Sequence, residues 1–73
     1  MKIAIIDLNR GSVYPLGDFS EDSLIIDIKK EIQRRFGVLV PYLAYNERIQ
    51  DDNVRIGGLT TIGVLNFECF INR

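Results

Sequence analysis

The 73-residue chain contains no histidine and a single cysteine, Cys69. One cysteine cannot form an internal disulfide, and a zinc site without histidine would need an unusual set of ligands. Catalytic triads that rely on histidine are excluded as well. We therefore expect a protein that is not an enzyme, with no catalytic residue, no metal site and no cofactor. Cys69 itself is expected to pack as a small apolar side chain.

The chain also lacks an excess of positive charge and a long apolar run. Nine Lys and Arg against ten Asp and Glu leave a net charge of −1 at pH 7. Phosphate binding depends on clustered Lys and Arg, so we expect no nucleic-acid partner. No apolar run approaches the roughly 20 residues that span a bilayer, and Met1 leads directly into a strand-like pattern. We expect no membrane association and a cytoplasmic or nuclear location, where thiols stay reduced.

Apolar residues make up 47% of the chain and charged residues 26%, which is typical of a globular domain. A core of this size barely offsets the conformational entropy lost on folding, so nearly every large apolar side chain has to be buried. The sequence contains no repeat, low-complexity tract or internal linker. We expect residues 1–73 to form one domain.

The stretch 20–38 has the pattern of a long amphipathic helix. Four apolar residues recur at intervals of three or four and so fall on one side of a helix: Ile25, Ile28, Ile32 and Phe36. Asp22 or Ser23 can cap its start, and Gly37 can take the left-handed conformation that ends it. We expect this helix to bury one face in the core.

Two strands are predicted before the helix. Residues 2–8 are rich in isoleucine, and Gly11 supplies the positive φ that a short hairpin turn needs. Residues 12–19 form the second strand, which Pro15 interrupts. Because proline has no N–H for the ladder, this strand must lie at an edge, with Gly17 at a bulge.

Shorter elements follow the helix. Residues 42–46 read as a strand, and a turn after them is expected to return Ile49 to the core. Three residues at helical or 3-10 spacing are expected to pack into the core beneath a loop: Ile56, Leu59 and Ile62. Residues 64–71 alternate with period two and form the last strand, with Cys69 on its core face.

This order of elements, with the residues in them, resembles the ubiquitin family. Three stretches carry the resemblance: MKIAIIDLNRGS, DSLIIDIKKEIQRRFGV and YLAYNERIQDD. The resemblance implies an α+β fold of the β-grasp type, in which a mixed sheet of four to five strands packs on one long helix. It also implies that Lys29 of the helix pairs with Asp51 or Asp52.

The final residues 71–73, Ile-Asn-Arg, contain no diglycine of the kind that ubiquitin-like modifiers activate. The resemblance therefore implies a non-covalent, non-enzymatic interaction module that acts as an adaptor or scaffold. Two alternatives stay open. The chain is a covalent modifier if the native protein extends to a diglycine, or it is the N-terminal ubiquitin-like domain of a larger protein of the ubiquitin pathway.

Ubiquitin binds partners on the sheet face away from its helix, and the resemblance places Leu8, Ala44 and Phe70 at matching positions. The resemblance also implies that the last strand lies between the first strand and the strand at 42–46. The outward residues of these three neighbouring strands form the predicted protein-binding site: Ile6, Leu8, Tyr42, Ala44, Glu68 and Phe70. We expect Lys2 and Arg48 to rim this site together with Glu68.

Exposed aromatic and aliphatic residues grouped in this way mark a partner site, and we expect Phe70 and Tyr42 to be its anchors. The partner is expected to be a protein, with components of the ubiquitin–proteasome system implied by the resemblance. The chain itself is expected to be a monomer or a subunit of a hetero-complex. The alternative is that these are the scattered apolar residues that most surfaces carry.

Overall fold

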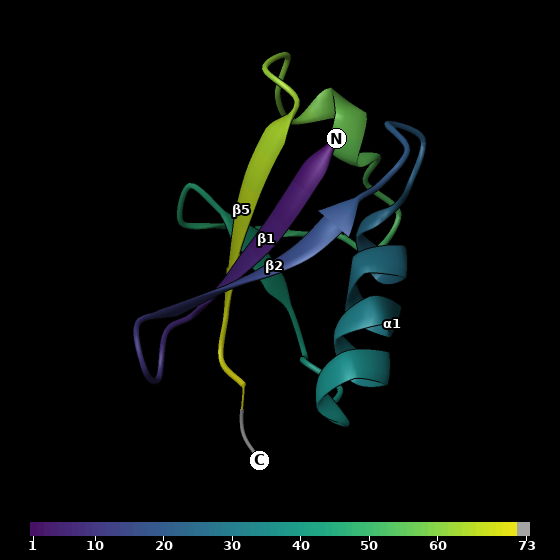
Figure 1. The fold of residues 1–73 in the computed structure, drawn as a ribbon. Helices are drawn as coiled ribbons and strands as arrows, with labels where there is room; N and C mark the ends of the chain where they lie inside the picture. The colour runs from purple at the N-terminus through teal and green to yellow at the C-terminus, as the bar shows by residue number, and fades with distance from the viewer. Residues whose placement is uncertain (72–73) are drawn as a thin grey trace.

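A mixed sheet with a helix on one side makes up residues 1–71, the part of the chain that the computed structural model describes (Figure 1). In chain order the elements are β1 (Lys2–Asp7), β2 (Ser12–Asp18), α1 (Ile25–Phe36), β3 (Leu43–Tyr45), β4 (Arg48–Gln50), the 3-10 turn η1 (Ile56–Gly58) and β5 (Val64–Cys69). The expected α+β class and a mixed sheet of five strands are confirmed within these residues. The helix is shorter than expected, because α1 has only 12 residues.

The first and last strands lie side by side in the sheet. The strand order is β2-β1-β5-β3-β4, and β1 pairs with β5 in parallel while the other pairs are antiparallel. In Figure 1, β5 and β1 run next to each other, with β2 beyond β1 and α1 to one side. The first, fifth and third strands are therefore neighbours, as the resemblance implies.

β2 is an edge strand with a bulge, in agreement with the expectation. Ile3 pairs with Gly17. The next residue of β1, Ala4, pairs with Pro15, so that Leu16 is the extra residue. Gly17 has a φ of 106°, which L side chains rarely adopt. The bulge turns Leu16 into the core, where it is buried.

The buried face of α1 follows the expected spacing. Ile25, Ile28 and Ile32 are fully buried. Gly37 ends the helix with a φ of 70°, and its N–H donates to the carbonyl of Gln33 at 2.9 Å. Within residues 1–71, no helix combines the length and the apolar character needed to cross a membrane.

The start of α1 differs from the expectation, because neither Asp22 nor Ser23 caps it. Leu24 occupies the N-cap position, and its N–H donates to Asp27 Oδ2 at 2.9 Å. The carbonyl of Ser23 accepts the N–H of Ile56 from η1, also at 2.9 Å. This contact holds the chain before Leu24 outside the helix, so the helix begins later than the capping residues suggested.

The core lies between α1 and the sheet. Its buried apolar residues come from the helix, the strands and η1: Ile3, Ile5, Leu16, Ile25, Ile28, Ile32, Val40, Leu43, Ile56, Leu65, Phe67, Cys69 and Ile71. Cys69 is buried there as a free thiol, in agreement with its expected packing role. Ile56 also fills the core as expected, and Leu59 packs against it.

Two apolar residues that were expected in the core lie at the surface. The turn between β3 and β4 has only two residues, Asn46 and Glu47, and both have positive φ. Ile49 consequently lies opposite Ala44 on the outward face of the sheet and is 67% exposed. Ile62 lies in the loop before β5 and is 78% exposed. Neither residue covers the core.

Candidate functional site

A mainly apolar row crosses the sheet on the face opposite α1. Its members lie beside one another in the register of the five strands, and we call them the sheet-face row: Val13, Ile6, Glu68, Ala44 and Ile49. Their neighbours along the strands, such as Ile5 and Phe67, are fully buried in the core. Val13 and Ile49 lie at the two ends of the row and are both exposed. The row therefore presents aliphatic surface to solvent.

An aromatic pair adjoins the sheet-face row. The rings of Tyr42 and Phe70 meet edge to face, with centroids 6.4 Å apart, an arrangement that aromatic rings prefer. Phe70 is 39% exposed and Leu8 is 43% exposed. The N–H of Leu8 donates to the carbonyl of Cys69 at 2.8 Å, which continues the pairing of β1 and β5 and brings Leu8 beside Phe70.

All six residues of the predicted site lie on this face. Three belong to the sheet-face row and three adjoin it: Ile6, Ala44, Glu68, Leu8, Tyr42 and Phe70. Ala44 offers little contact area, because it is only 7% exposed. The sequence analysis missed Val13 and Ile49. Their positions follow only from the cross-strand register, which pairs Val13 with Ile6 and Ile49 with Ala44.

The expected rim is only partly correct. Lys2 pairs with Asp18 and Val64 and shares their outward face. Arg48 lies opposite Tyr45 in the β3–β4 pair. Tyr45 packs on the core ring of Phe67, with centroids 6.1 Å apart, and directly opposed residues of an antiparallel pair share a face. Arg48 therefore belongs to the core side of the sheet and does not rim the site.

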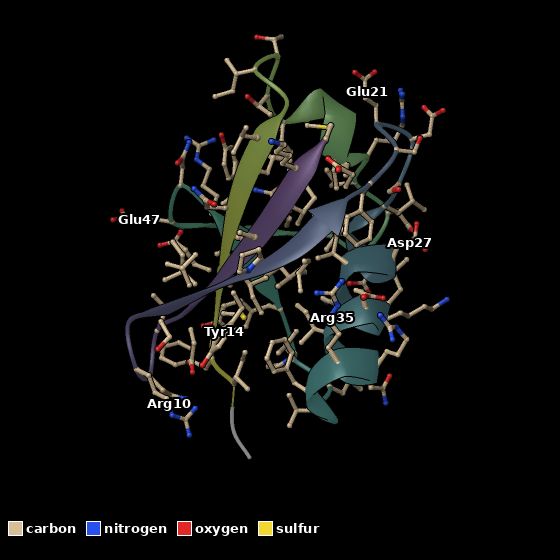
Figure 2. All side chains as sticks on the ribbon, in the orientation of Figure 1. Arg10, Tyr14, Glu21, Asp27, Arg35 and Glu47 are labelled. Carbon is tan, nitrogen blue, oxygen red and sulfur yellow. The ribbon has the colours of Figure 1, made fainter. Side chains whose placement is uncertain are left out.

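Glu68 lies in the middle of the sheet-face row, between Ile6 of β1 and Ala44 of β3. Its Oε1 accepts the N–H of Glu47 at 3.1 Å, which ties the β3–β4 turn to β5. Figure 2 shows Glu47 at the outer end of this turn, on the side of the molecule away from α1. Across the residues that the structure describes, no cation lies within ion-pair distance of Glu68.

An open hollow lies beside Glu68, and we call it the Glu68 hollow. Its lining consists of three aliphatic residues, one tyrosine, two asparagines and two glutamates: Ile6, Ile62, Val64, Tyr45, Asn46, Asn66, Glu47 and Glu68. Within residues 1–71, no Lys or Arg contributes to this lining. The hollow thus combines an apolar wall with unneutralised negative charge.

Asp7 is a buried acid that the sequence analysis did not single out. Its carboxylate accepts N–H groups from Asn9 at 3.0 Å and from Ile71 at 3.3 Å, and the guanidinium of Arg10 at 3.0 Å. Burial raises the pKa of Asp7, but these hydrogen bonds more than offset that effect and hold the pKa below its ordinary value. The alternation of buried residues along β1 was the available signal, because it places Asp7 on the core face. The role of Asp7 is structural.

Cys69 lies beside Asp7 in the β1–β5 pair. Burial, and to a smaller extent the charge of Asp7, raises the pKa of Cys69 to about 11. The thiol therefore stays protonated at neutral pH. Because the thiolate is the nucleophile, Cys69 offers no reactive group.

Lys29 and Asp52 form the ion pair that the resemblance implies. Their Nζ and Oδ1 atoms are 2.5 Å apart, and the same Nζ donates to the carbonyl of Pro41 at 3.2 Å. The ammonium is nearly buried, whereas the Asp52 side chain is half exposed. This contact joins α1 to the loop after β4.

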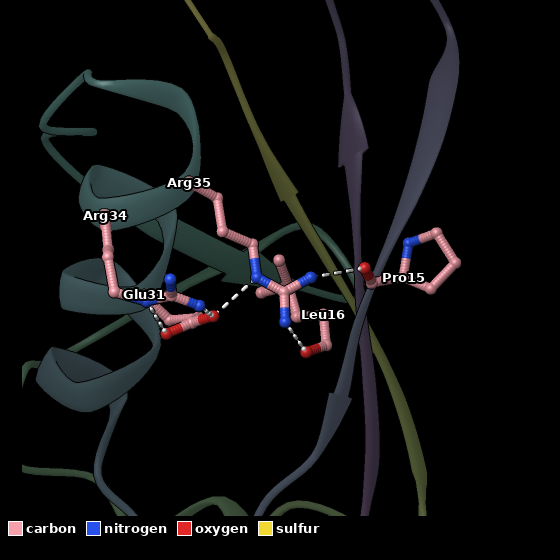
Figure 3. A network of polar contacts seen from close by, with 5 residues as sticks. All are labelled: Pro15, Leu16, Glu31, Arg34 and Arg35. Atoms are coloured by element: carbon pink, nitrogen blue, oxygen red, sulfur yellow. Dashed lines mark hydrogen bonds and ion pairs between the residues drawn. The ribbon is translucent and has the colours of Figure 1, made fainter.

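The basic residues at the end of α1 also form hydrogen bonds within the protein (Figure 3). Arg34 and Arg35 both donate to the carboxylate of Glu31. Arg35 additionally donates to the carbonyls of Pro15 at 3.2 Å and Leu16 at 2.6 Å on the bulged edge strand. Hydrogen bonds from Arg34 and Arg35 lower the pKa of Glu31 to about 2. This network connects the helix to β2.

Between Met1 and Ile71, no three side chains of His, Cys, Asp or Glu are grouped closely enough to hold a metal ion. The sequence matches no protein-family model, and no curated protein matches it.

Proposed function

We propose that this chain is a ubiquitin-like domain of the β-grasp type, which binds a protein partner non-covalently and serves as an adaptor or scaffold. The order of its elements supports the fold, since a hairpin and a helix are followed by strands of which the last inserts beside the first. The Lys29–Asp52 ion pair supports it as well. Components of the ubiquitin–proteasome system are the proposed partners, and the cytoplasm or nucleus is the proposed location.

The observation that carries the function is the outward sheet face. The sheet-face row and the aromatic pair of Tyr42 and Phe70 lie next to each other, so exposed apolar side chains are grouped on one face around the carboxylate of Glu68. Grouped exposed apolar residues typically mark interaction sites. Phe70 is the more exposed ring of this aromatic pair, and buried aromatic anchors dominate the binding energy of protein interfaces.

Substitution of Phe70 tests the proposed surface. The protein is immobilised, its partner is recovered from a lysate of the source cells, and the recovered partner is titrated against wild type and Phe70→Ala. Losing a central aromatic anchor costs about 2 kcal/mol or more, so we expect Phe70→Ala to weaken binding by more than about tenfold.

Leu39→Ala is the matched control, because Leu39 is an exposed apolar residue that follows α1 and lies outside the sheet face. It should leave binding unchanged. Melting curves of both variants separate binding from stability, since Phe70 also contacts Tyr42. Unchanged binding by a folded Phe70→Ala variant would rule out the sheet face as the site.

A further inference from the structure

The position of Glu68 restricts what can cover the sheet face. Ile6 and Ala44 flank Glu68 on the two neighbouring strands. A partner that contacts both aliphatic residues must therefore also cover the carboxylate between them. Burying an ionised carboxylate without compensation costs several kcal/mol. A purely apolar partner is consequently disfavoured on this face.

The protein itself supplies only part of the compensation. Glu68 Oε1 accepts one backbone N–H from Glu47. Along the described residues, neither an ion pair nor a further hydrogen bond satisfies the rest of the carboxylate. The carboxylate of Glu47 adds a second negative charge to the lining of the hollow. None of the residues from Met1 to Ile71 supplies a compensating positive charge, which leaves this role to the partner.

We propose that the partner inserts an arginine side chain into the Glu68 hollow. This inference rests on the proposed sheet-face function and specifies the partner's chemistry. The aliphatic part of the arginine packs along Ile6, Ile62 and Val64, and its guanidinium binds the carboxylate of Glu68. Arginine fits better than lysine, because its planar fork donates to both carboxylate oxygens and to a neighbouring amide such as Asn66. Apolar residues next to the arginine cover the remainder of the row.

An unbiased peptide selection tests this inference. A phage library of random 12-residue peptides is selected against the full 73-residue chain, and the enriched peptides are synthesised and titrated. We expect the enriched peptides to share an arginine flanked by apolar residues. Glu68→Gln should weaken their binding by about tenfold or more, because the charge is lost from a desolvated pair.

The controls keep the test specific. The glutamine introduced by Glu68→Gln retains an oxygen that can accept the Glu47 N–H, so this variant should keep its melting temperature. Asp18→Asn removes an exposed carboxylate from the same face but outside the hollow, and it should not change peptide affinity. In the peptide, Arg→Lys should weaken binding less than Arg→Ala.

The outcomes separate this inference from the function on which it rests. If Phe70→Ala weakens peptide binding but Glu68→Gln does not, the arginine inference is wrong, whereas the proposal that the sheet face is the binding site is retained. If neither variant changes the affinity, or if no peptide is enriched, both proposals fail. Enriched peptides that lack a cation, or that bind more tightly after Arg→Lys, would also overturn the arginine inference.

Discussion

Asp7 illustrates how a single buried residue can organise a small domain through its hydrogen bonds. The carboxylate lies at the end of β1, fully buried, and accepts hydrogen bonds from the following turn and from the chain just after β5. Asn9 Nδ2 also donates to the carbonyl of Ile71 at 3.3 Å, so the two segments are joined twice. Burial of this charge is tolerated because it is fully paired.

We predict that Asp7→Asn destabilises the protein. An amide can still accept an N–H, but its NH₂ group would face the donors of Arg10 or a backbone N–H, and one of these would lose its acceptor. The melting temperature at pH 7 should fall by roughly 5 °C or more, whereas Asp18→Asn at an exposed position should leave it unchanged. Equal melting temperatures for the two variants, measured by circular dichroism, would contradict the role assigned to Asp7.

Among the elements, α1 and β2 are held together by polar contacts as well as by the core. Glu31 orients the guanidinium of Arg35, which in turn donates to two carbonyls of the bulge (Figure 3). The Glu31 side chain is only 19% exposed, so this carboxylate is less screened by solvent than a typical surface pair.

This network should make the stability of the protein depend on acid pH. The folded-state pKa of Glu31 is lowered to about 2, so its contribution is complete above the ordinary glutamate pKa and is lost as the pH falls from about 4.5 towards 2. Glu31→Gln should lower the melting temperature at pH 7 and reduce the difference between pH 7 and pH 2. An unchanged pH profile in melts of the variant would contradict the network's contribution.

The same elements show what local patterns can and cannot predict. The spacing of Ile25, Ile28 and Ile32 predicted the buried side of α1 correctly, because helical periodicity is a local property. The position of Ile49 was predicted wrongly, because a two-residue turn sets the face of the following strand and a shift of one residue reverses it. The helix start depended on η1, far away in sequence, whose N–H groups bind the chain before Leu24.

At the scale of the whole molecule, only part of the candidate site could be predicted from the sequence. Alternation along β1 and β5 placed Ile6, Glu68 and Phe70 on the outward face, and the resemblance made β1 and β5 neighbours. Val13 and Ile49 extend this surface to both sheet edges, yet only cross-strand register shows that they do. The Glu68 hollow could not be foreseen at all, because it forms between β5, the β3–β4 turn and a loop.

The core also determines the stability of the whole domain, and α1 supplies its centre. Ile28→Ala should lower the free energy of unfolding by about 2–5 kcal/mol, because it removes a fully buried side chain and leaves a cavity. Lys30→Ala, on the exposed side of the same helix, should change it by less than about 0.5 kcal/mol. Urea denaturation measures both, and a loss below about 0.5 kcal/mol for Ile28→Ala would contradict the assigned helix phase.

The bulge in β2 has a consequence for how this protein meets other chains. Pro15 has no N–H to offer, and the carbonyls of Pro15 and Leu16 are already bound by Arg35. This stretch of the sheet edge therefore cannot template an incoming strand, and the opposite edge, β4, is only three residues long. Both edges resist β-augmentation and edge-to-edge aggregation. These edges favour the proposed mode of binding, in which another protein contacts the outward sheet face with its side chains and does not pair with an edge through its backbone.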